Sequence, residues 1–413
     1  MRLFSLITTL LVCWSYPTLC QTNEIVITFA GDVNFNRSGQ KPEAKGARKA
    51  GFHTWTELSN KIEHLFDGDI NFVNLETVVT DKNNLRPANK KFVFQSHPAS
   101  LNHLQTLGVN LVSAANNHAY DYRWKGYNET HKHLKNSGVN FAGIGLRKDI
   151  LQPTIFEHKG VKIAFNALSF LSDPYPASDT QVGILNLRNR KHWREVIKNL
   201  GQVKADIKIL SLHQGIERQV TLEGGVRANF TKAVKDAGIN LLLAHHPHVA
   251  RGVERVSETS VIYYGLGNFL MLGARNMGPL PNAQDYGLFG KAYFQNKDDG
   301  LWTVAALEAH PITDMHLKPK PMKAKEGTVR LKLLNKLSRR TSKNQAVKFH
   351  ISSSGVGLAC FIKAESWPYI SAEQTDTRSH RICSDKAKNV VIKPNYKPRW
   401  RQPAPITELP FGI

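Results

Sequence analysis

Six short polar clusters, each at the end of an apolar run, contain most of the residues in this chain whose types could do chemistry. They supply carboxylate, amide and imidazole groups, which are the oxygen and nitrogen donors that hard and borderline divalent metals prefer. They are spread over about 240 residues, so a site can form only where the fold brings distant segments together. The ends of neighbouring strands in one sheet provide such convergence. The clusters are Gly31-Asp32, Asn74-Leu75-Glu76, Asn116-Asn117-His118, His213-Gln214-Gly215-Ile216-Glu217, His245-His246-Pro247-His248 and Gly265-Leu266-Gly267-Asn268-Phe269.

Each cluster follows a short apolar segment, and segments with helical spacing lie between these runs. Short runs rich in Val, Ile and Leu are typical of strands buried on both faces. Because strand and helix alternate, the sequence predicts an α/β fold in which ligands bind where strand ends open into loops. The predicted strands are Ile25–Ala30, Ile70–Val73, Leu111–Ala114, Ile207–Leu212, Leu241–Leu243 and Val261–Tyr264, and the predicted helices are Trp55–Phe66, Ser100–Leu107, Tyr127–Asn136, His192–Val203 and Arg227–Ala237.

Several common catalytic motifs are absent from the sequence. It has no GxxxxGKS or GxxxxGKT phosphate loop, no GxGxxG dinucleotide motif at the start of a helix and no GxSxG nucleophile elbow. Nucleotide hydrolysis by a P-loop and serine esterase chemistry therefore have no support.

The order and wording of the six clusters resemble the CapA family, the poly-γ-glutamate capsule biosynthesis proteins built on a calcineurin-like metallophosphoesterase fold. The family pattern is approximately GD, NLE, NNH with a following D, HWGxE, GHHPH and SLGNF. This chain has AGDVNF, VNLETVV, AANNHAYDY, LHQGIE, AHHPHV and YGLGNF in the same order. The resemblance implies a layered sandwich of mixed sheets flanked by helices. The chain departs from the pattern at Gln214 for Trp, Ala244 for Gly and Gly265 for Ser, and the Ala restricts the backbone at an expected turn.

The resemblance also implies a site that holds one or two divalent ions, with Mn, Fe, Mg and Zn all compatible with the donor set. In that site His118 assists the leaving group as an acid, and Asp121 orients His118. His245 is a second choice as a ligand. The expected metal ligands are Asp32, Glu76, Asn117, His213, His246 and His248.

Taken one at a time, these residues also have structural interpretations. Asp32 could cap a turn, the Asn pair could satisfy backbone groups at a strand end, and His213 could be a buried, hydrogen-bonded residue. Glu217 is as well suited to holding an Arg or a loop as to touching substrate, and Asn268 suits a Gly-flanked turn. Neither Glu217 nor Asn268 is predicted to be catalytic.

The N-terminus has the pattern of a secretory signal peptide over residues 1–20. Arg2 precedes an apolar stretch that is short for a membrane span, and polar residues follow. Cleavage near Cys20 with soluble export is expected, in the periplasm, outside the cell or at the cell envelope. Lipid attachment at Cys20 and an uncleaved anchor are the alternatives. In an exported chain, Cys360 and Cys383 are expected to form a disulfide.

The chain is strongly basic, with a formal net charge of +22 and a sequence pI of about 9.8. We divide it into the signal peptide, a CapA-like domain over residues 21–325 and a basic C-terminal region over residues 326–413, with a Lys- and Pro-rich linker near Lys318–Lys325. Strands in that region are expected to make it β-rich. Its charge suits an anionic polymer or the anionic envelope surface, and a solvated basic face with no partner is the alternative. Export argues against nucleic acid. The predicted C-terminal strands are Val329–Leu334, Ala346–Ile351, Val356–Ile362 and Val390–Ile392.

Three functions are compatible with these features. The leading hypothesis is an exported, metal-dependent hydrolase-type protein that acts in biosynthesis or export of an anionic capsule polymer such as poly-γ-glutamate, with membrane synthase subunits as possible partners. The second is a non-catalytic polymer-binding or assembly subunit that uses the basic C-terminal region. The third is an exported phosphodiesterase with no capsule role.

Overall fold

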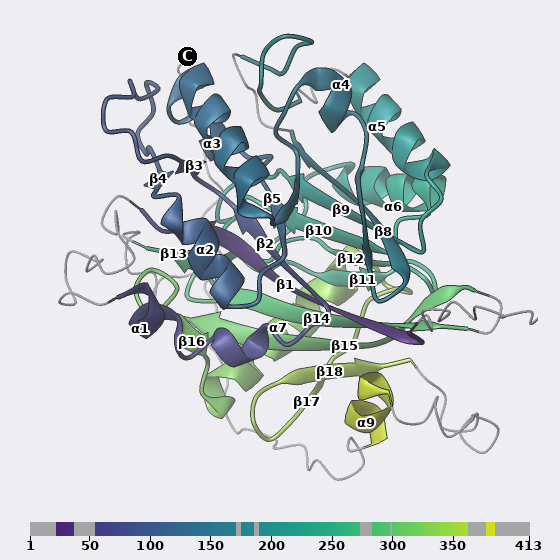
Figure 1. The fold of residues 1–413 in the computed structure, drawn as a ribbon. Helices are drawn as coiled ribbons and strands as arrows, with labels where there is room; N and C mark the ends of the chain where they lie inside the picture. Colours follow the sequence, from purple (N-terminus) through teal and green to yellow (C-terminus); the bar gives the residue numbers. More distant parts are fainter. Residues whose placement is uncertain are drawn as a thin grey trace, which may run out of the picture.

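The computed structural model describes residues 22–36, 54–170, 175–185, 190–272, 283–297, 300–361 and 377–384. The predicted signal peptide and the predicted strand Val390–Ile392 lie outside these residues. Within them, two large β-sheets pack face to face, and helices cover the outer face of each sheet (Figure 1). The predicted α/β class, with mixed sheets flanked by helices, is confirmed.

The larger sheet contains the first three predicted strands. Over the described ranges it has ten strands in the order β17-β18-β15-β14-β1-β2-β5-β6, with β13 beside β1 and β16 beside β15. The run β1-β2-β5-β6 is parallel, and β14 and β15 add antiparallel strands on the other side of β1. The strands are β1 (Glu24–Asn34), β2 (Ile70–Leu75), β5 (Leu111–Ser113), β6 (Asn140–Ala142), β13 (Asn268–Met271), β14 (Gly287–Asn296), β15 (Trp302–Thr313), β16 (Lys320–Pro321), β17 (His350–Ile351) and β18 (Gly357–Cys360).

The second sheet contains the other three predicted strands. In the described part of the chain it has six strands in the order β11-β12-β10-β9-β8-β7, and β8, β9, β10 and β12 run parallel. A separate pair, β3 (Val78–Val79) and β4 (Gln95–Ser96), lies beside the larger sheet. The strands of the second sheet are β7 (Thr154–His158), β8 (Val161–Ser169), β9 (Ile207–His213), β10 (Leu241–His245), β11 (Val253–Arg255) and β12 (Val261–Tyr263).

Strand alternation explains why the two sheets pack together. Phe29 and Phe72 of the larger sheet meet Tyr263 and Phe165 of the second sheet, with ring centroids 4.7 and 5.8 Å apart. Alternate residues of the same strands point outward to the helices, so both faces of each sheet are buried. This is why the strands contain nearly continuous apolar runs.

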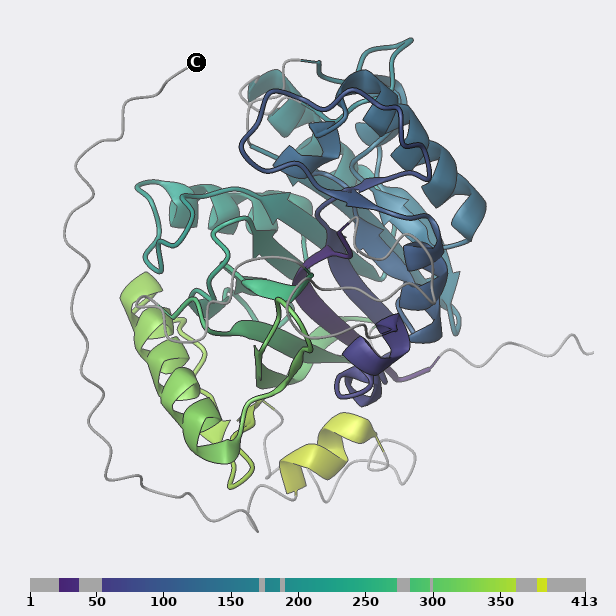
Figure 2. The same cartoon turned by 90° about the vertical axis from the view of Figure 1, so that its left-hand side faces the viewer.

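Helices form the two outer layers. Side chains of α1, α2 and α3 pack on the larger sheet, and those of α5 and α6 pack on the second sheet. Helix α7 packs Leu331 and Leu334 into the core between the sheets, at one margin of the molecule (Figure 2). The helices are α1 (Trp55–Ser59), α2 (Ala99–Thr106), α3 (Arg123–Ser137), α4 (Arg147–Ile150), α5 (Arg190–Gln202), α6 (Val226–Ala237), α7 (Ala324–Thr341) and α9 (Arg378–Ser384), with 3-10 turns η2 (Glu63–Leu65) and η3 (Asn117–Tyr120).

The C-terminal part of the described chain differs from the prediction in three places. Of the predicted strand Ala346–Ile351, only His350–Ile351 forms a strand, β17. Val329–Leu334, predicted as a strand, lies within α7, so this prediction was wrong. Lys320–Pro321, within the expected linker, pairs with β15 as β16 and belongs to the larger sheet. The division at residue 325 stays a prediction, and it falls in the first turn of α7.

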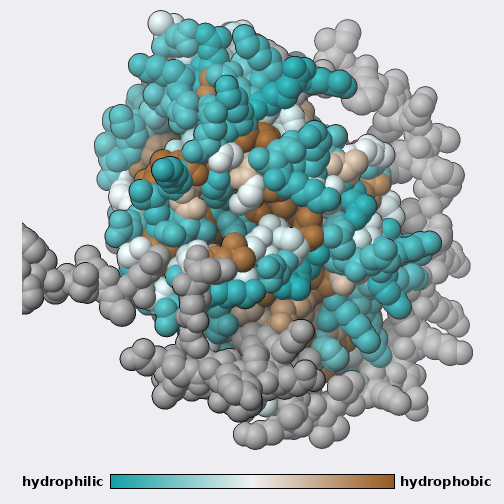
Figure 3. Space-filling view, turned by 90° about the vertical axis from the view of Figure 1, so that its right-hand side faces the viewer, coloured by the Kyte–Doolittle hydropathy of each residue, from teal (hydrophilic) through white to brown (hydrophobic). Residues whose placement is uncertain are grey.

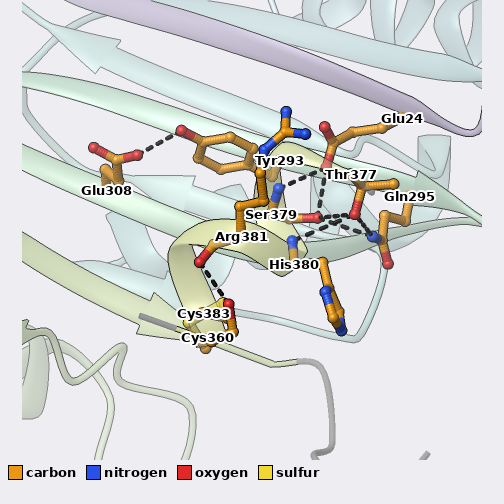
Figure 4. Close-up of a disulfide and its surroundings, with 11 residues drawn as sticks. Glu24, Tyr293, Gln295, Glu308, Cys360, Thr377, Ser379, His380, Arg381 and Cys383 are labelled. Atoms are coloured by element: carbon orange, nitrogen blue, oxygen red, sulfur yellow. Dashed lines mark hydrogen bonds between the residues drawn. A yellow bond between two sulfur atoms is a disulfide. The ribbon is translucent and has the colours of Figure 1, made fainter. Parts of the chain in front are cut away.

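The expected disulfide joins Cys360, at the end of β18, to Cys383 in α9, with Cα atoms 5.9 Å apart (Figure 4). The bond holds α9 near the start of β1, where Thr377 and Ser379 also contact Gln295 of β14. The C-terminal region is therefore joined to the larger sheet both covalently and by hydrogen bonds.

The surface carries few large apolar side chains. Seen from the side opposite to Figure 2, it is mostly hydrophilic with separate apolar areas (Figure 3). Isolated exposed apolar residues of this kind are normal in folded proteins. Over the described ranges, no helix combines the length and apolar character needed to cross a membrane.

Candidate metal centre

The end of β1 places Asp32 by means of a close backbone contact. A Cβ atom on Gly31 would lie 1.7 Å from the carbonyl oxygen of Gly267, so no larger residue fits there. The Asp32 amide donates to that same oxygen at 3.1 Å. Irregular register on both sides of Asp32 turns the strand locally, as β-bulges do, and leaves the carboxylate fully buried.

The neighbouring parallel strands supply further oxygen donors. Asn74, at the end of β2, donates from Nδ2 to Asp32 Oδ1 at 2.8 Å, and the same nitrogen is 3.2 Å from His213 Nδ1. Glu76 follows β2 and is fully buried, and Asn117 begins the 3-10 turn η3 after β5. The larger sheet thus supplies the carboxylates and amides.

The second sheet supplies the imidazoles. His213 ends β9, and His246 and His248 follow β10. His246 and His248 have positive φ angles of 92° and 54°. Such backbone angles cost about 1–3 kcal/mol each for non-glycine residues and are often found at functional sites. The rings lie close together here, with centroid distances of 5.0 Å for His213–His246 and 5.9 Å for His246–His248.

Donors from the two sheets meet at short distances. His213 Nε2 lies 2.8 Å from Asn117 Oδ1 and 3.4 Å from Glu76 Oε1. His248 Nδ1 lies 3.1 Å from Asp32 Oδ2 and 4.0 Å from Glu76 Oε2. The sequence-based expectation that the clusters converge in one sheet was therefore wrong in detail, because the site forms where the strand ends of two facing sheets meet.

Several buried polar atoms of this cluster have no hydrogen-bond partner among the described residues. They include Asp32 Oδ2, both Glu76 carboxylate oxygens, His246 Nδ1 and both ring nitrogens of His245. Glu76, His246 and His248 each present a donor atom within 4.8 Å of the others. Because buried polar groups are nearly always paired, unpaired carboxylate and imidazole donors at this spacing fit a divalent cation.

The charge balance of the side chains also fits a cation. Burial alone would raise the pKa of Asp32, but the imidazoles of His245 and His248 hold it well below its usual value. Burial and the charge of Asp32 raise the pKa of Glu76 well above its usual value. Burial would lower the pKa of His248, but Glu76 and Asp32 raise it to about 10. A proton on His248 thus offsets the charge of Asp32, and a metal ion could replace that proton.

The other two imidazoles favour the neutral form that binds metals. Burial and the charge of His248 lower the pKa of His246 to about 3. Burial and the charge of His246 lower the pKa of His213 well below its usual value. Both rings are therefore neutral at physiological pH and able to act as ligands.

His118 and Asp121 form a pair at the edge of the cluster. His118 Nδ1 lies 2.6 Å from Asp121 Oδ2, and the His118 ring stacks on Phe94 with a centroid distance of 4.0 Å. Asp121 also accepts from Lys90 Nζ at 2.6 Å and from the Phe94 amide at 2.6 Å. Burial lowers the pKa of His118 although Asp121 opposes this effect. The contacts fix the ring and leave Nε2 available for proton transfer.

A buried arginine holds the loop that connects β9 to α6. Arg251, only 1% exposed, donates to both carboxylate oxygens of Glu223, at 3.0 and 2.8 Å, and to the carbonyl oxygens of Gln219 and Ile216. The sequence interpretation gave Glu217 a possible role in holding an Arg. The structure assigns that contact to Glu223 and leaves Glu217 exposed.

The structure brings together all eight residues that the sequence proposed as ligands or catalytic groups, and their roles stay predictions. It adds Asn74, Lys90 and Phe94, for which no role was predicted. Asn268, interpreted as a turn residue, contacts His248 Nδ1 through Oδ1 at 2.7 Å. The NLE motif could have indicated Asn74. Lys90 and Phe94 lie in none of the six clusters, so no signal in the sequence indicated them.

The departures from the family pattern have local explanations in two cases. Ala244 lies inside β10 and not at a turn, so the predicted backbone restriction does not arise. A Cβ atom on Gly265 would lie 2.9 Å from Arg251 Cγ, so glycine leaves room for the buried arginine. Nothing in the structure explains Gln214.

A second group of possible donors, Asp81, Glu129 and His133, is less suited to a metal. Glu129 already accepts from Lys82 Nζ at 2.6 Å, so an ammonium group already offsets its charge.

The comparisons with known proteins support the family that the order of the six clusters suggests. The family model described as bacterial capsule synthesis protein PGA_cap matches residues 26–272, more than half of the chain. The chain belongs to this family. The CapA resemblance expected from the six motifs is thereby confirmed.

Two relatives are named CapA. The PGA biosynthesis protein CapA of Bacillus subtilis (strain 168) is 26% identical over 305 residues, covering 72% of this chain and 75% of the relative. The capsule biosynthesis protein CapA of Bacillus anthracis is 28% identical over 200 residues, covering 47% of each chain.

Solved structures give weaker similarity. A hypothetical protein from Thermus thermophilus has a TM-score of 0.40 and 15% identity, covering 72% of this chain and 99% of that one. The 5'-nucleotidase from Candida albicans has a TM-score of 0.39 and 11% identity, covering 68% of this chain and 53% of that one. The fold assignment rests on the sheets and helices described above.

Proposed function

We propose that this PGA_cap family member is an exported protein that acts in biosynthesis or export of an anionic capsule polymer such as poly-γ-glutamate, through a divalent-metal hydrolase-type site. The observation that supports it most is the set of buried, unpaired donor atoms on Asp32, Glu76 and His246 beside His248. Family membership supports the capsule role, and the donor set supports the metal.

The residues that would hold one or two divalent ions come from both sheets. A divalent ion bound there would activate water and stabilise negative charge on a phosphoester or another electrophile. Carboxylate, amide and imidazole donors suit Mn, Fe, Mg or Zn. The proposed ligands are Asp32, Glu76, Asn117, His213, His246 and His248.

His118 is the proposed proton donor to the leaving group. Its Nδ1 is engaged by Asp121, so Nε2 is the nitrogen that can give a proton, and it carries that proton only in the imidazolium form, which the Asp121 carboxylate favours. The stacked Phe94 ring and the Lys90 contact to Asp121 hold this pair in one orientation. Asp121 is therefore a positioning residue, which acts on the reaction through His118.

The Cys360–Cys383 disulfide supports export, because disulfides persist in oxidising compartments and are rare in the reducing cytosol. We accordingly propose that the protein acts in the periplasm, outside the cell or at the envelope surface. Its proposed partners are the anionic polymer, membrane synthase subunits and the anionic envelope surface.

The test uses purified protein incubated with Mn, Fe, Mg or Zn. Wild type, His118→Gln and His310→Gln are compared for cleavage of poly-γ-glutamate, measured by polymer size, and for hydrolysis of simple phosphoesters. His310 is the matched control, because it is a partly buried histidine on β15 paired with Glu308. We expect metal-dependent polymer cleavage that falls about 10²- to 10⁴-fold in His118→Gln alone.

Two results would change the proposal. Hydrolysis of phosphodiesters without action on the polymer would favour a phosphodiesterase. Polymer binding with no metal-dependent reaction on any substrate would favour a non-catalytic assembly subunit.

A further inference from the structure

Helix α7 presents a row of basic side chains along one exposed face. At 100° per residue, the five positions fall within an arc of about 100°, and they extend over roughly 22 Å of helix. All five side chains are exposed. We call this row the α7 basic face; it consists of Lys325, Lys332, Lys336, Arg339 and Arg340.

The opposite face of α7 is committed to the core. Leu331, Leu334 and Leu337 are buried, and the helix lies at the outside of the molecule (Figure 2). At 100° per residue, these leucines lie on the side of the helix opposite to the exposed α7 basic face. The basic residues are therefore not needed for the packing of the helix.

The charges of the basic face are not balanced by carboxylates of the described residues. Over the described ranges, none of its five residues forms an ion pair with a carboxylate. Arg330, on another side of the same helix, does pair with Asp285. The sequence of α7 contains a single acidic residue, Glu326. Helix α7 can thus form an ion pair with a neighbouring carboxylate, but the five residues of the α7 basic face form none with the described residues.

The arrangement also works against the stability of the helix. Lys332 and Lys336 are four residues apart, as are Lys336 and Arg340, and like charges at this spacing repel. Lys325 lies in the first turn, where the helix dipole disfavours a cation. The dipole accounts for Arg339 and Arg340 in the last turn but not for the other three. A solvated face without a partner would gain from acidic residues at these positions.

The C-terminal end of α7 lies against the loop that carries the site histidines. Ser338 Oγ accepts from the Val253 amide at 2.9 Å, and a Cβ atom on Gly252 would lie 2.6 Å from Thr341 Oγ1. Gly252 is four residues after His248. A chain bound along α7 would therefore run toward the margin of the candidate metal centre.

We propose that the α7 basic face is a docking surface for a linear polycarboxylate, which it holds beside the metal centre. Regularly spaced carboxylates on one chain complement a row of cations that has no internal partners. The identification of the ligand as a polymer rests on the proposed function, whereas the surface itself rests on the geometry of α7.

The test compares two variants with equal loss of charge. The first replaces all five residues of the α7 basic face with Gln. The matched control replaces five exposed lysines of other helices and loops with Gln, at Lys132, Lys135, Lys198, Lys204 and Lys235. Binding of poly-γ-glutamate is measured at low and physiological salt, with thermal unfolding of each variant as a check on folding.

We expect the α7 variant to bind the polymer about tenfold more weakly or worse, with a reduced salt dependence. The control should stay close to wild type. Thermal stability of the α7 variant should stay close to that of wild type, because removal of the repulsion offsets the lost dipole interaction of Arg339 and Arg340. Lower affinity therefore cannot be explained by unfolding.

Three outcomes would overturn the proposal: unchanged polymer binding by the α7 variant, equal loss in both variants, or loss of binding to anionic lipid vesicles with polymer binding intact. The last would make α7 a membrane-facing surface. Metal content of the α7 variant separates this test from that of the proposed function, since the α7 variant should keep its metal. His246→Ala should keep polymer binding while losing metal.

Discussion

Strand β1 has a buried acidic residue at each end, and the two ends are built differently. Glu24 begins the strand, and its carboxylate accepts from the backbone amide of Arg378 at 2.8 Å. It also accepts from the amide of Ser379 at 2.9 Å (Figure 4). Asp32 lies near the other end, where Asn74 contacts one oxygen and the second has no hydrogen-bond partner among the described residues. His248, although 3.1 Å from that oxygen, is hydrogen-bonded to Asn268.

The difference separates a structural network from a binding site. Around Glu24, amide and hydroxyl donors satisfy the carboxylate, and the network fastens the C-terminal segment to the sheet. Around Asp32, unpaired carboxylate oxygens and imidazole nitrogens face one another. Buried polar groups without partners are costly, so a cluster of them is expected where a ligand supplies the missing interactions.

The largest effect is expected from changing the two acids separately. Asp32→Asn should lower metal-dependent activity at least about 100-fold, because it removes a charged ligand. Glu24→Gln should leave activity per folded molecule unchanged and lower stability only. Steady-state kinetics of both variants on the same substrate would check this, and similar activities would remove the distinction between the two ends.

Removal of the disulfide should lower stability by loosening the segment held at the Glu24 end of β1, and it should leave the candidate metal centre unchanged. Cys360 and Cys383 are separated by 23 residues, and closing a loop of this size contributes about 3 kcal/mol in the chain-entropy model. The double Cys→Ser variant should unfold at lower denaturant concentration and retain wild-type metal content. Loss of metal in this variant would show that the two ends are not independent.

A pair of buried serines gives a finer test. Ser379 Oγ contacts Glu24 and Gln295, whereas Ser211 Oγ in β9 has no hydrogen-bond partner among the described residues. Ser379→Ala should reduce the free energy of unfolding by about 1–3 kcal/mol, and Ser211→Ala should be nearly neutral. Chemical denaturation of both variants measures the difference, and equal effects would contradict the account of the satisfied network.

The smallest effect is a pH dependence in metal-free protein. The folded-state pKa of His246 is lowered to about 3 from the usual 6.5, so the unfolded chain gains a proton first as the pH falls. Between about 6.5 and 3, wild type should therefore lose stability relative to His246→Gln. Near the Glu24 end of β1, Asp69 accepts from the Val26 amide at 2.8 Å. The pKa of Asp69 is lowered from 3.8, because Lys159 and Arg378 outweigh its burial. Its contribution is lost only below about 3.8.

Thermal unfolding in chelator, from neutral to acidic pH, tests this expectation. A constant difference between wild type and His246→Gln over that range would contradict the assigned pKa shift. Asp69→Asn serves as the control for the other end of the strand.

Much of the fold was predictable because short apolar runs end in polar clusters. The six predicted strands correspond to β1, β2, β5, β9, β10 and β12, and the clusters after them form the site. Residues such as Ile25, Ile27 and Phe29 belong to the core between the sheets, so their apolar character has a direct physical cause. The candidate metal ligands and catalytic residues could be found because they directly follow these apolar runs.

Other features depend on long-range pairing that local sequence does not encode. The division of the six strands between two sheets follows from contacts such as Phe72–Phe165, which are distant in sequence. Val329–Leu334 alternates like a strand over a short window, but Leu331, Leu334 and Leu337 have helical spacing over the longer one. The contact of Arg251 with Glu223 joins two loops and has no local signature.

The most direct test of the central claim is the metal content of purified protein after exposure to Mn, Fe, Mg and Zn, measured by mass spectrometry. Wild type is compared with the His246→Ala, His248→Ala double variant and with His310→Gln. The account predicts one or two divalent ions in wild type and His310→Gln, and none in the double variant. No metal in wild type, or equal metal in the double variant, would contradict a metal centre at the end of β1.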